Sequence, residues 1–159
     1  MFRPLRRKHN VIDEAAAREL LATERRGVLA VNGDDGYPYA VPVNYFYDAD
    51  AGKIYLHGSK KGHKVDAITG SDKVCFTVYG NERPVAGEEW APTVQSVVVF
   101  GRCKLIDESE EAAAKVRKLA GKYYPSAELV EEEIAHSLKA MYLYEIDIEH
   151  LCGKQVQEK

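Results

Sequence analysis

The run from Tyr37 to Tyr47 constrains the fold more than any other part of the chain, because it has the character of a strand that is apolar on both faces. A strand of this kind is expected to be covered on both sides. Its two prolines, Pro38 and Pro42, each remove a hydrogen-bond donor, so the strand should lie at a sheet edge or beside a bulge. An unpaired apolar edge invites a ligand or a second subunit, although a loop that caps the edge would also explain it.

Other segments with strand character follow one another closely. They are Val28–Val31, Lys53–Leu56, Lys73–Tyr79, Ser96–Ile106 and Met141–Ile148, and Gly101 is expected to form a bulge or bend within the fourth of them. Most are separated by connections short enough for hairpins. This pattern predicts a mainly β fold with peripheral helices, namely a small antiparallel barrel of about six strands rather than a parallel βαβ sheet.

Helices are expected around this barrel. The expected segments are Glu14–Leu21 after an Asp13 N-cap, Val65–Ile68 ending at Gly70, an apolar stripe from Ala112 to Tyr123 that starts after Asp107 or Ser109, and Ala127–Ala135. We therefore expect one domain over residues 1–159. It would comprise an arm and helix over 1–26, a barrel with inserted helices over 27–148 and a polar tail over 149–159.

The stretch His57-Gly58-Ser59-Lys60-Lys61-Gly62-His63-Lys64 connects an expected strand to an expected helix. Glycines allow the backbone to approach a ligand closely, and the free N–H groups of a first helical turn carry partial positive charge. Lysines and imidazoles add further donors. This combination suits a phosphate group, although Lys and Gly are also ordinary residues of solvated turns.

Charge and cysteine content narrow the function classes. The net charge is −3, which gives no electrostatic case for nucleic-acid binding. The basic arm with Arg3, Arg6, Arg7 and Lys8 has no apolar run for a signal or a membrane span, so we interpret it as a solvated or partner-crossing arm and expect no membrane contact. Cys75, Cys103 and Cys152 are scattered, so we expect a reduced, cytoplasmic protein without a structural metal site.

The order of several motifs resembles one family. Gly36–Tyr45, Ile54–Ser59, Gly62-His63-Lys64 and Ser96–Gly101 together resemble the FMN-binding split barrel of the pyridoxamine 5′-phosphate oxidase-like group, and within it the nitroimidazole-reductase (Nim-type) proteins. The resemblance covers roughly residues 27–148. It implies a six-stranded antiparallel split β-barrel and a homodimer with FMN at the interface.

The resemblance also implies roles for particular residues. Val41, Pro42, Val43 and Asn44 are expected beside the flavin ring, and Ser96 resembles a ring contact. The expected ribityl-phosphate side comprises His57, Ser59, Lys60, Lys61, His63 and Lys64. Trp90, in the long connection from Gly80 to Pro92, is expected to stack near the ring from the other subunit, with a plain interface or core role as the alternative.

The expected function is that of an FMN-dependent oxidoreductase that acts on a small electron-poor organic molecule, with NAD(P)H or another donor refilling the flavin. His57 is the candidate proton donor or substrate anchor, with a structural or phosphate-side role as the alternative. Leu151–Lys159 has no counterpart of the oxidase's basic C-terminal segment, so pyridoxamine phosphate is not the expected substrate. Two alternatives are a non-catalytic flavin-binding or storage protein and a haem-binding split barrel that uses His57, His63, His136 or His150.

Overall fold

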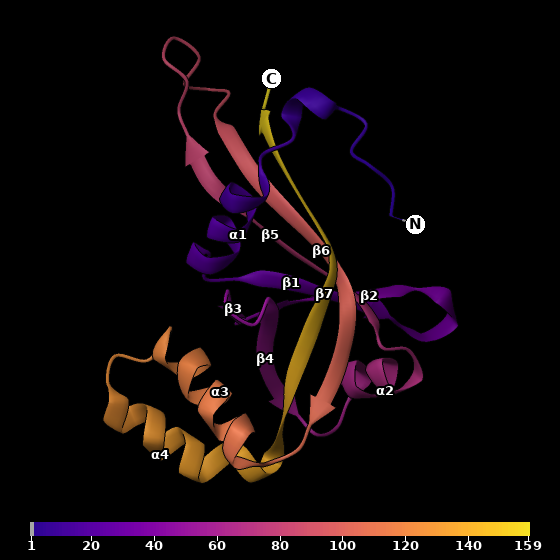
Figure 1. Ribbon diagram of the computed structural model, residues 1–159, viewed down its shortest axis with the longest axis vertical. Coiled ribbons are helices and arrows are strands. Elements are labelled where there is room, and N and C mark those ends of the chain that lie inside the picture. Colours follow the sequence, from indigo (N-terminus) through magenta and orange to yellow (C-terminus); the bar gives the residue numbers. More distant parts are fainter. Residues whose placement is uncertain (1) are drawn as a thin grey trace.

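The strands form one antiparallel sheet that twists strongly and curls around the main core (Figure 1). In the computed structural model, which describes residues 2–159, the strand order is β2-β1-β5-β6-β7-β4-β3. The strands are β1 (Gly27–Asn32), β2 (Pro38–Val43), β3 (Phe46–Asp48), β4 (Lys53–Ser59), β5 (Lys73–Arg83), β6 (Thr93–Ile106) and β7 (Met141–Gln157). The predicted mainly β, antiparallel split-barrel fold is confirmed.

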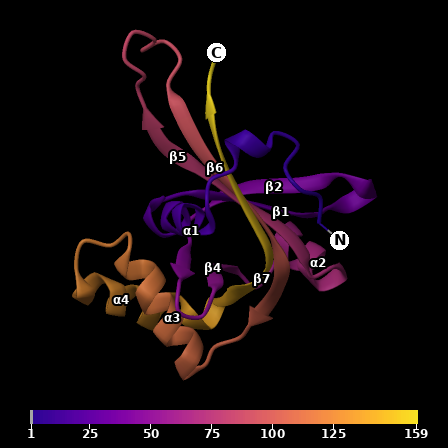
Figure 2. The same cartoon turned by 45° about the horizontal axis from the view of Figure 1, so that its top comes forward.

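The helices lie around the sheet (Figure 2). They are α1 (Glu14–Thr23), α2 (His63–Gly70), α3 (Glu110–Gly121) and α4 (Ala127–Ser137), with 3-10 turns η1 (Lys8–Asn10), η2 (Asp34–Gly36) and η3 (Leu138–Ala140). The predicted N-cap of α1 is confirmed, because the Asp13 carboxylate accepts from the Ala16 N–H at 2.7 Å. Of the two candidate caps of α3, Ser109 serves as the cap and accepts from the Ala112 N–H at 3.0 Å.

The run Tyr37–Tyr47 is not one strand, and this correction explains why the described residues form seven strands rather than six. The chain leaves the sheet at Asn44 and Tyr45. The Tyr45 side chain is fully buried, its hydroxyl donates to the Leu21 carbonyl at 2.6 Å, and its N–H donates to the Tyr123 hydroxyl at 2.9 Å. Because these groups bond outside the sheet, β2 ends at Val43 and β3 begins at the opposite edge.

The predicted edge position of the proline-bearing strand is confirmed. Within the described sheet β2 pairs with β1 alone, and its neighbour along the chain, β3, pairs with β4 alone. Val41 and Val43 are half-buried, whereas Pro38, Ala40 and Pro42 form the exposed face. The two edges of the sheet are therefore joined only by Asn44 and Tyr45, and one of them presents an apolar face to solvent.

The predicted irregularity at Gly101 is also confirmed. The β6–β7 register shifts between Phe100, which pairs with His150, and Gly101, which pairs with Ile148. A Cβ atom built at Gly101 would lie 2.3 Å from the Asp147 carbonyl oxygen. The two strands can approach this closely only because the residue has no side chain.

The strand β7 is longer than predicted, because it continues past Ile148 to Gln157. This last part was expected to be a polar tail. It pairs with the start of β6, with Thr93 opposite Gln157. Backbone pairing with β6 sustains this extension, and Leu151 within it packs against the main core. On its exposed side the Gln95 and Gln155 amides bond at 3.0 Å.

Two apolar clusters divide β4 between them. Ile54 and Leu56 lie in the main core inside the barrel, together with α1, whereas Tyr55 lies in a second cluster beneath α3 and α4. Successive side chains of a strand point to opposite faces. His57, two residues after Tyr55, therefore points toward α3 and α4 rather than into the barrel.

Candidate functional site

The basic loop, residues 57–64, forms the turn from β4 to α2 (Figure 1). Gly62 has φ 116° and precedes α2 without supplying a side-chain cap. The N–H groups of Val65 and Asp66 both donate to the Gly62 carbonyl, at 2.9 and 3.1 Å. The earlier N–H groups of the helix are left for solvent or a ligand, and a Cβ atom at Gly62 would meet nothing within 4 Å. The helix start is therefore open, as an anion site requires.

The three lysines of this loop differ in their partners. Lys60 forms an ion pair with Asp107, and its ammonium group lies 5.5 Å from the Tyr142 ring centroid. Within residues 2–159 no carboxylate forms an ion pair with Lys61 or Lys64, and the Lys64 ammonium lies 5.6 Å from the Tyr144 ring centroid. Lys61 and Lys64 thus carry charge without a protein counter-ion, whereas Asp107 neutralises Lys60.

His63, the first residue of α2, points toward the β1–β2 turn. Its ring stacks on Tyr39 with centroids 4.2 Å apart, and its Nε2 atom lies 3.7 Å from an Asp34 carboxylate oxygen. This Nε2 atom is buried, and among the described residues it has no hydrogen-bond partner. The side chain thus links α2 to the edge strand β2. At the open helix start, His63 can offer a ligand its backbone N–H group.

The structure brings Asn44 and His57 together. Both line a small cavity of about 30 Å³ beneath α3 and α4. The other walls of this cavity come from Val116, Leu119, Ala120, Tyr123, Tyr124, Glu133, Ile134 and Met141. Neither α3 nor α4 was expected in the site from the sequence. The alternation along β4 shows which face His57 occupies, but it does not show that these two helices cover that face.

Burial lowers the pKa of His57 below its ordinary value. The negative charge of Glu133 opposes this shift, and the positive charge of Lys64 reinforces it. The residue still keeps an exposed surface, since only one side of it faces the cavity. Among the predicted site residues, His57 can therefore exchange a proton with solvent on one side and with a group in the cavity on the other.

Trp90 and Ser96 lie elsewhere in the chain. They belong to the β5–β6 hairpin, which projects away from the end of the molecule that carries α2 (Figure 1). Trp90 is 73% exposed, and Tyr79 on the same hairpin is 71% exposed. Neither Trp90 nor Ser96 meets the basic loop within one copy of the chain, so contact with a ligand there requires a second copy.

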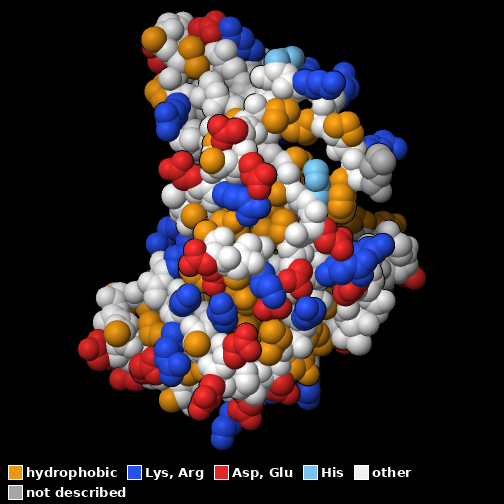
Figure 3. Space-filling view, viewed as in Figure 1, with side chains coloured by type: hydrophobic (Ala, Val, Ile, Leu, Met, Phe, Trp, Pro, Cys, Tyr) orange, Lys and Arg blue, Asp and Glu red, His pale blue; other side chains and the backbone are white. Residues whose placement is uncertain are grey.

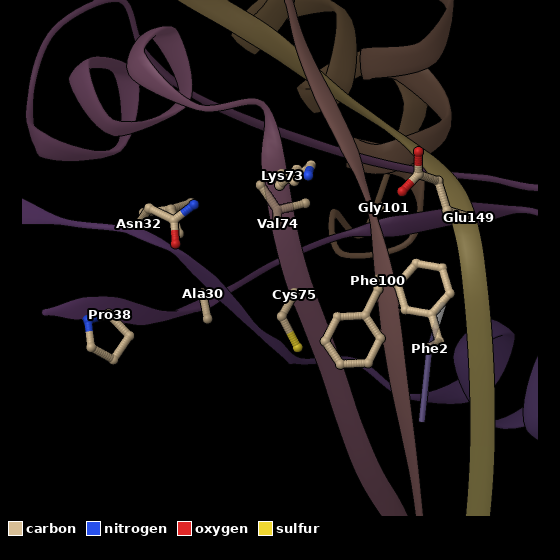
Figure 4. Close-up of a pocket in the computed structure, with 11 residues that line it drawn as sticks. Phe2, Ala30, Asn32, Pro38, Lys73, Val74, Cys75, Phe100, Gly101 and Glu149 are labelled. Atoms are coloured by element: carbon tan, nitrogen blue, oxygen red, sulfur yellow. The ribbon is translucent and has the colours of Figure 1, made fainter. Parts of the chain in front are cut away.

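The exposed face of β2 continues into an apolar hollow across β1, β5 and β6. The hollow has a volume of about 340 Å³, and Ala30, Pro38, Cys75 and Phe100 line it (Figure 4). Phe2 of the N-terminal arm stacks there on His150, with ring centroids 4.7 Å apart. Hydrophobic side chains gather beside this arm in the space-filling view (Figure 3). Phe2 therefore contacts the sheet of its own chain, whereas the basic residues of the arm, Arg3, Arg6, Arg7 and Lys8, are exposed.

The four histidines considered as haem ligands lie on four different elements. His57 is on β4, His63 on α2, His136 on α4 and His150 on β7. No group of three or more His, Cys, Asp or Glu side chains suited to a metal ion occurs within residues 2–159. In the same part of the chain, no helix is long and apolar enough to cross a membrane.

The fold and the site define a split β-barrel whose open helix start lies beside an edge strand. The family model described as pyridoxamine 5′-phosphate oxidase matches residues 13–155, and the chain belongs to this family. A search of curated proteins finds no match.

Solved structures share this fold at low sequence identity. A proposed 5-nitroimidazole antibiotic resistance protein from Bacteroides thetaiotaomicron has a TM-score of 0.75 and 19% identity, covering 92% of this chain and 87% of that one. An FAD-binding protein from Mesorhizobium loti has a TM-score of 0.63 and 22% identity, covering 92% and 96%. A flavocytochrome from Azotobacter vinelandii has a TM-score of 0.69 and 20% identity, covering 95% and 71%.

Proposed function

We propose that this protein binds a flavin, specifically FMN, and uses it as an oxidoreductase toward a small electron-poor organic molecule. The observation that carries the proposal is the open start of α2 beside Lys61 and Lys64, which form no ion pair among residues 2–159. Through the His63–Tyr39 stack, this helix start also lies next to the apolar edge strand β2. Fold neighbours that are described as FAD-binding and as a flavocytochrome support a flavin. FMN fits the loop better than a non-phosphorylated flavin, because the loop offers donors and positive charge for a phosphate.

The chain's own residues divide the work of holding this cofactor. The N–H groups at the start of α2, the Ser59 hydroxyl and the Lys61 and Lys64 ammonium groups would bind the phosphate. The backbone of Val41–Val43 and the Asn44 amide would lie along the ring. The fit has support in the geometry, since Gly62 leaves the helix start open, with nothing within 4 Å of a Cβ atom built there.

A homodimer is part of the same proposal. The exposed face of β2 is apolar, and the hairpin that carries Trp90 and Ser96 projects away from its own basic loop. A second copy that covers this face would bury Pro38, Ala40 and Pro42 and bring the hairpin to the partner's site. Trp90 would then stack near the ring, and Ser96 would contact its polar edge.

The chemistry would come from the bound flavin, which transfers a hydride between NAD(P)H or another donor and the substrate. His57 would hold or donate the proton that accompanies reduction of the substrate, since its imidazole lines the cavity shared with Asn44. A cytoplasmic location accompanies the proposal, because Cys75, Cys103 and Cys152 are all free thiols.

An absorbance spectrum of the purified protein, taken before and after addition of FMN and desalting, tests the proposal. Two retained bands of oxidised flavin are expected, followed by bleaching with NAD(P)H under anaerobic conditions. A colourless protein that does not take up FMN would contradict it. Retained FMN that NAD(P)H does not reduce would favour a storage protein, and a Soret band after addition of haem would favour a haem protein.

A further inference from the structure

The cavity beside His57 has one charged wall. Glu133, on α4, lines it together with His57 and Asn44, and the remaining lining residues are apolar or tyrosine. The Glu133 carboxylate accepts a hydrogen bond from the Ser137 hydroxyl at 2.6 Å, one helical turn further along α4. The carboxylate is therefore held in place, and Glu133 is half-buried where it lines the cavity.

Glu133 and His57 do not form a direct ion pair within the described structure. The cavity between the walls measures about 30 Å³, which exceeds the roughly 10–15 Å³ that a single water molecule needs. A water there would find an imidazole nitrogen, a carboxylate and the Asn44 amide as polar partners. That is a sufficient set for an ordered, bridging water.

We propose that Glu133 is a positioning residue for His57: through one water in this cavity its carboxylate orients the imidazole and keeps a proton on it. The inference deepens the proposed function, because it assigns the group that controls the proton donor of the same site. A carboxylate on the far side of an imidazole is a recurrent device for fixing its orientation and protonation.

The charges around His57 are consistent with this role. Lys64 on α2 disfavours the imidazolium form, and the other titratable residues that line the cavity besides Glu133 are Tyr123 and Tyr124. The negative charge of Glu133 opposes the lowering of the His57 pKa by burial. Without it, His57 would lose its proton at a lower pH, and the protein would have fewer protonated donors near neutrality.

The direct test is a pH titration of His57 in the full chain without added flavin, in which NMR of the imidazole monitors its protonation. Glu133→Gln keeps the size and removes the charge, and we expect it to lower the pKa of His57 by roughly 0.5–1 unit. Glu132→Gln is the matched control, because it removes the same charge from the exposed face of the same helix. Ser137→Ala, which frees the carboxylate, should give a smaller shift in the same direction.

The second readout uses the FMN-loaded protein and a nitro-aromatic probe. If reduction needs protonated His57, kcat falls as the pH rises through its pKa, and in Glu133→Gln that fall should move to lower pH with KM unchanged. Equal titrations of His57 in the wild type, Glu133→Gln and Glu132→Gln would overturn the inference. Failure to bind FMN would overturn the proposed function and leave the titration to decide this inference.

Discussion

The hydroxyl of Tyr123 holds both backbone polar groups of Tyr45. It accepts the Tyr45 N–H at 2.9 Å, and its one hydrogen is shared between the Tyr45 carbonyl at 2.8 Å and the Arg25 carbonyl at 2.7 Å. A side chain after α3 thus replaces the strand partner that Tyr45 would have in a continuous sheet. This contact fixes the point at which the chain crosses from one edge of the barrel to the other.

Tyr123→Phe should therefore destabilise the protein. It removes the hydroxyl and leaves two half-buried backbone groups without their partner, which costs about 1–3 kcal/mol. Urea denaturation followed by circular dichroism measures the change. Tyr124→Phe is the control, because Tyr124 is 40% exposed, and it should change the free energy of unfolding by less than about 0.5 kcal/mol. Equal effects of the two variants would mean that the hydroxyl of Tyr123 contributes nothing specific.

Asp48 should make the stability depend on pH. It is 6% exposed, and its carboxylate accepts hydrogen bonds from the Lys115 ammonium at 2.9 Å and from the Ala51 N–H at 3.1 Å. The hydrogen bond from Lys115 is the largest cause that lowers the pKa of Asp48. A carboxylate with a lowered pKa in the folded state stabilises the protein above its unfolded pKa of about 3.9, and this stabilisation is lost as the pH falls through the folded value.

The variant Asp48→Asn should remove that dependence and lower the free energy of unfolding at pH 7 by about 2 kcal/mol, because it leaves Lys115 partly buried without a counter-ion. Urea denaturation at a series of pH values between pH 2 and pH 7 measures both effects, and those bounds are about the span of a carboxylate titration. Asp50→Asn, at an exposed position of the same turn, should keep the wild-type pH profile. A profile unchanged in Asp48→Asn would show that other carboxylates determine acid stability.

Gly101→Ala should disrupt the bulge between β6 and β7. The new Cβ atom would approach the Asp147 carbonyl to 2.3 Å, so the backbone would have to move, at a cost of about 2 kcal/mol or more. Gly121→Ala is the contrasting variant. It lies at the end of α3 with nothing within 4 Å of the new atom, and we expect no loss of stability. Thermal unfolding of both variants measures the difference, and similar melting temperatures would contradict the steric argument.

Lys64→Ala should weaken FMN binding more than Lys60→Ala does. Lys64 has no protein counter-ion among residues 2–159, whereas Asp107 already neutralises Lys60. Loss of a charge-assisted bond to phosphate corresponds to roughly a tenfold rise in Kd, and we expect less than about a threefold rise for Lys60→Ala. Titration of FMN fluorescence at two salt concentrations measures both variants. Equal losses would indicate that the loop acts only through its total charge.

Much of the fold follows from local signals in the sequence. The prolines of β2 placed it at an edge, Asp13 marked the start of α1, and Gly101 marked the bulge. Each of these residues has a conformational preference that hardly depends on its surroundings. The extension of β7 to Gln157 carried no such signal, because it depends on backbone pairing with a distant strand.

The candidate site was only partly predictable. The basic loop stands out as a sequence motif, and its place between β4 and α2 follows from the flanking patterns. The pairing of Lys60 with Asp107 and the presence of Glu133 beside His57 join residues far apart in the chain. Such contacts depend on how α3 and α4 pack on β4, and no local preference determines that packing.

The crossing at Asn44 and Tyr45 also sets a limit on breathing motions of the barrel. Consecutive Cα atoms are about 3.8 Å apart, so Val43 and Phe46, which end the two free edges, can never separate by more than about 11 Å. At this end of the barrel, the length of the connecting chain therefore limits how far β2 and β3 can move apart.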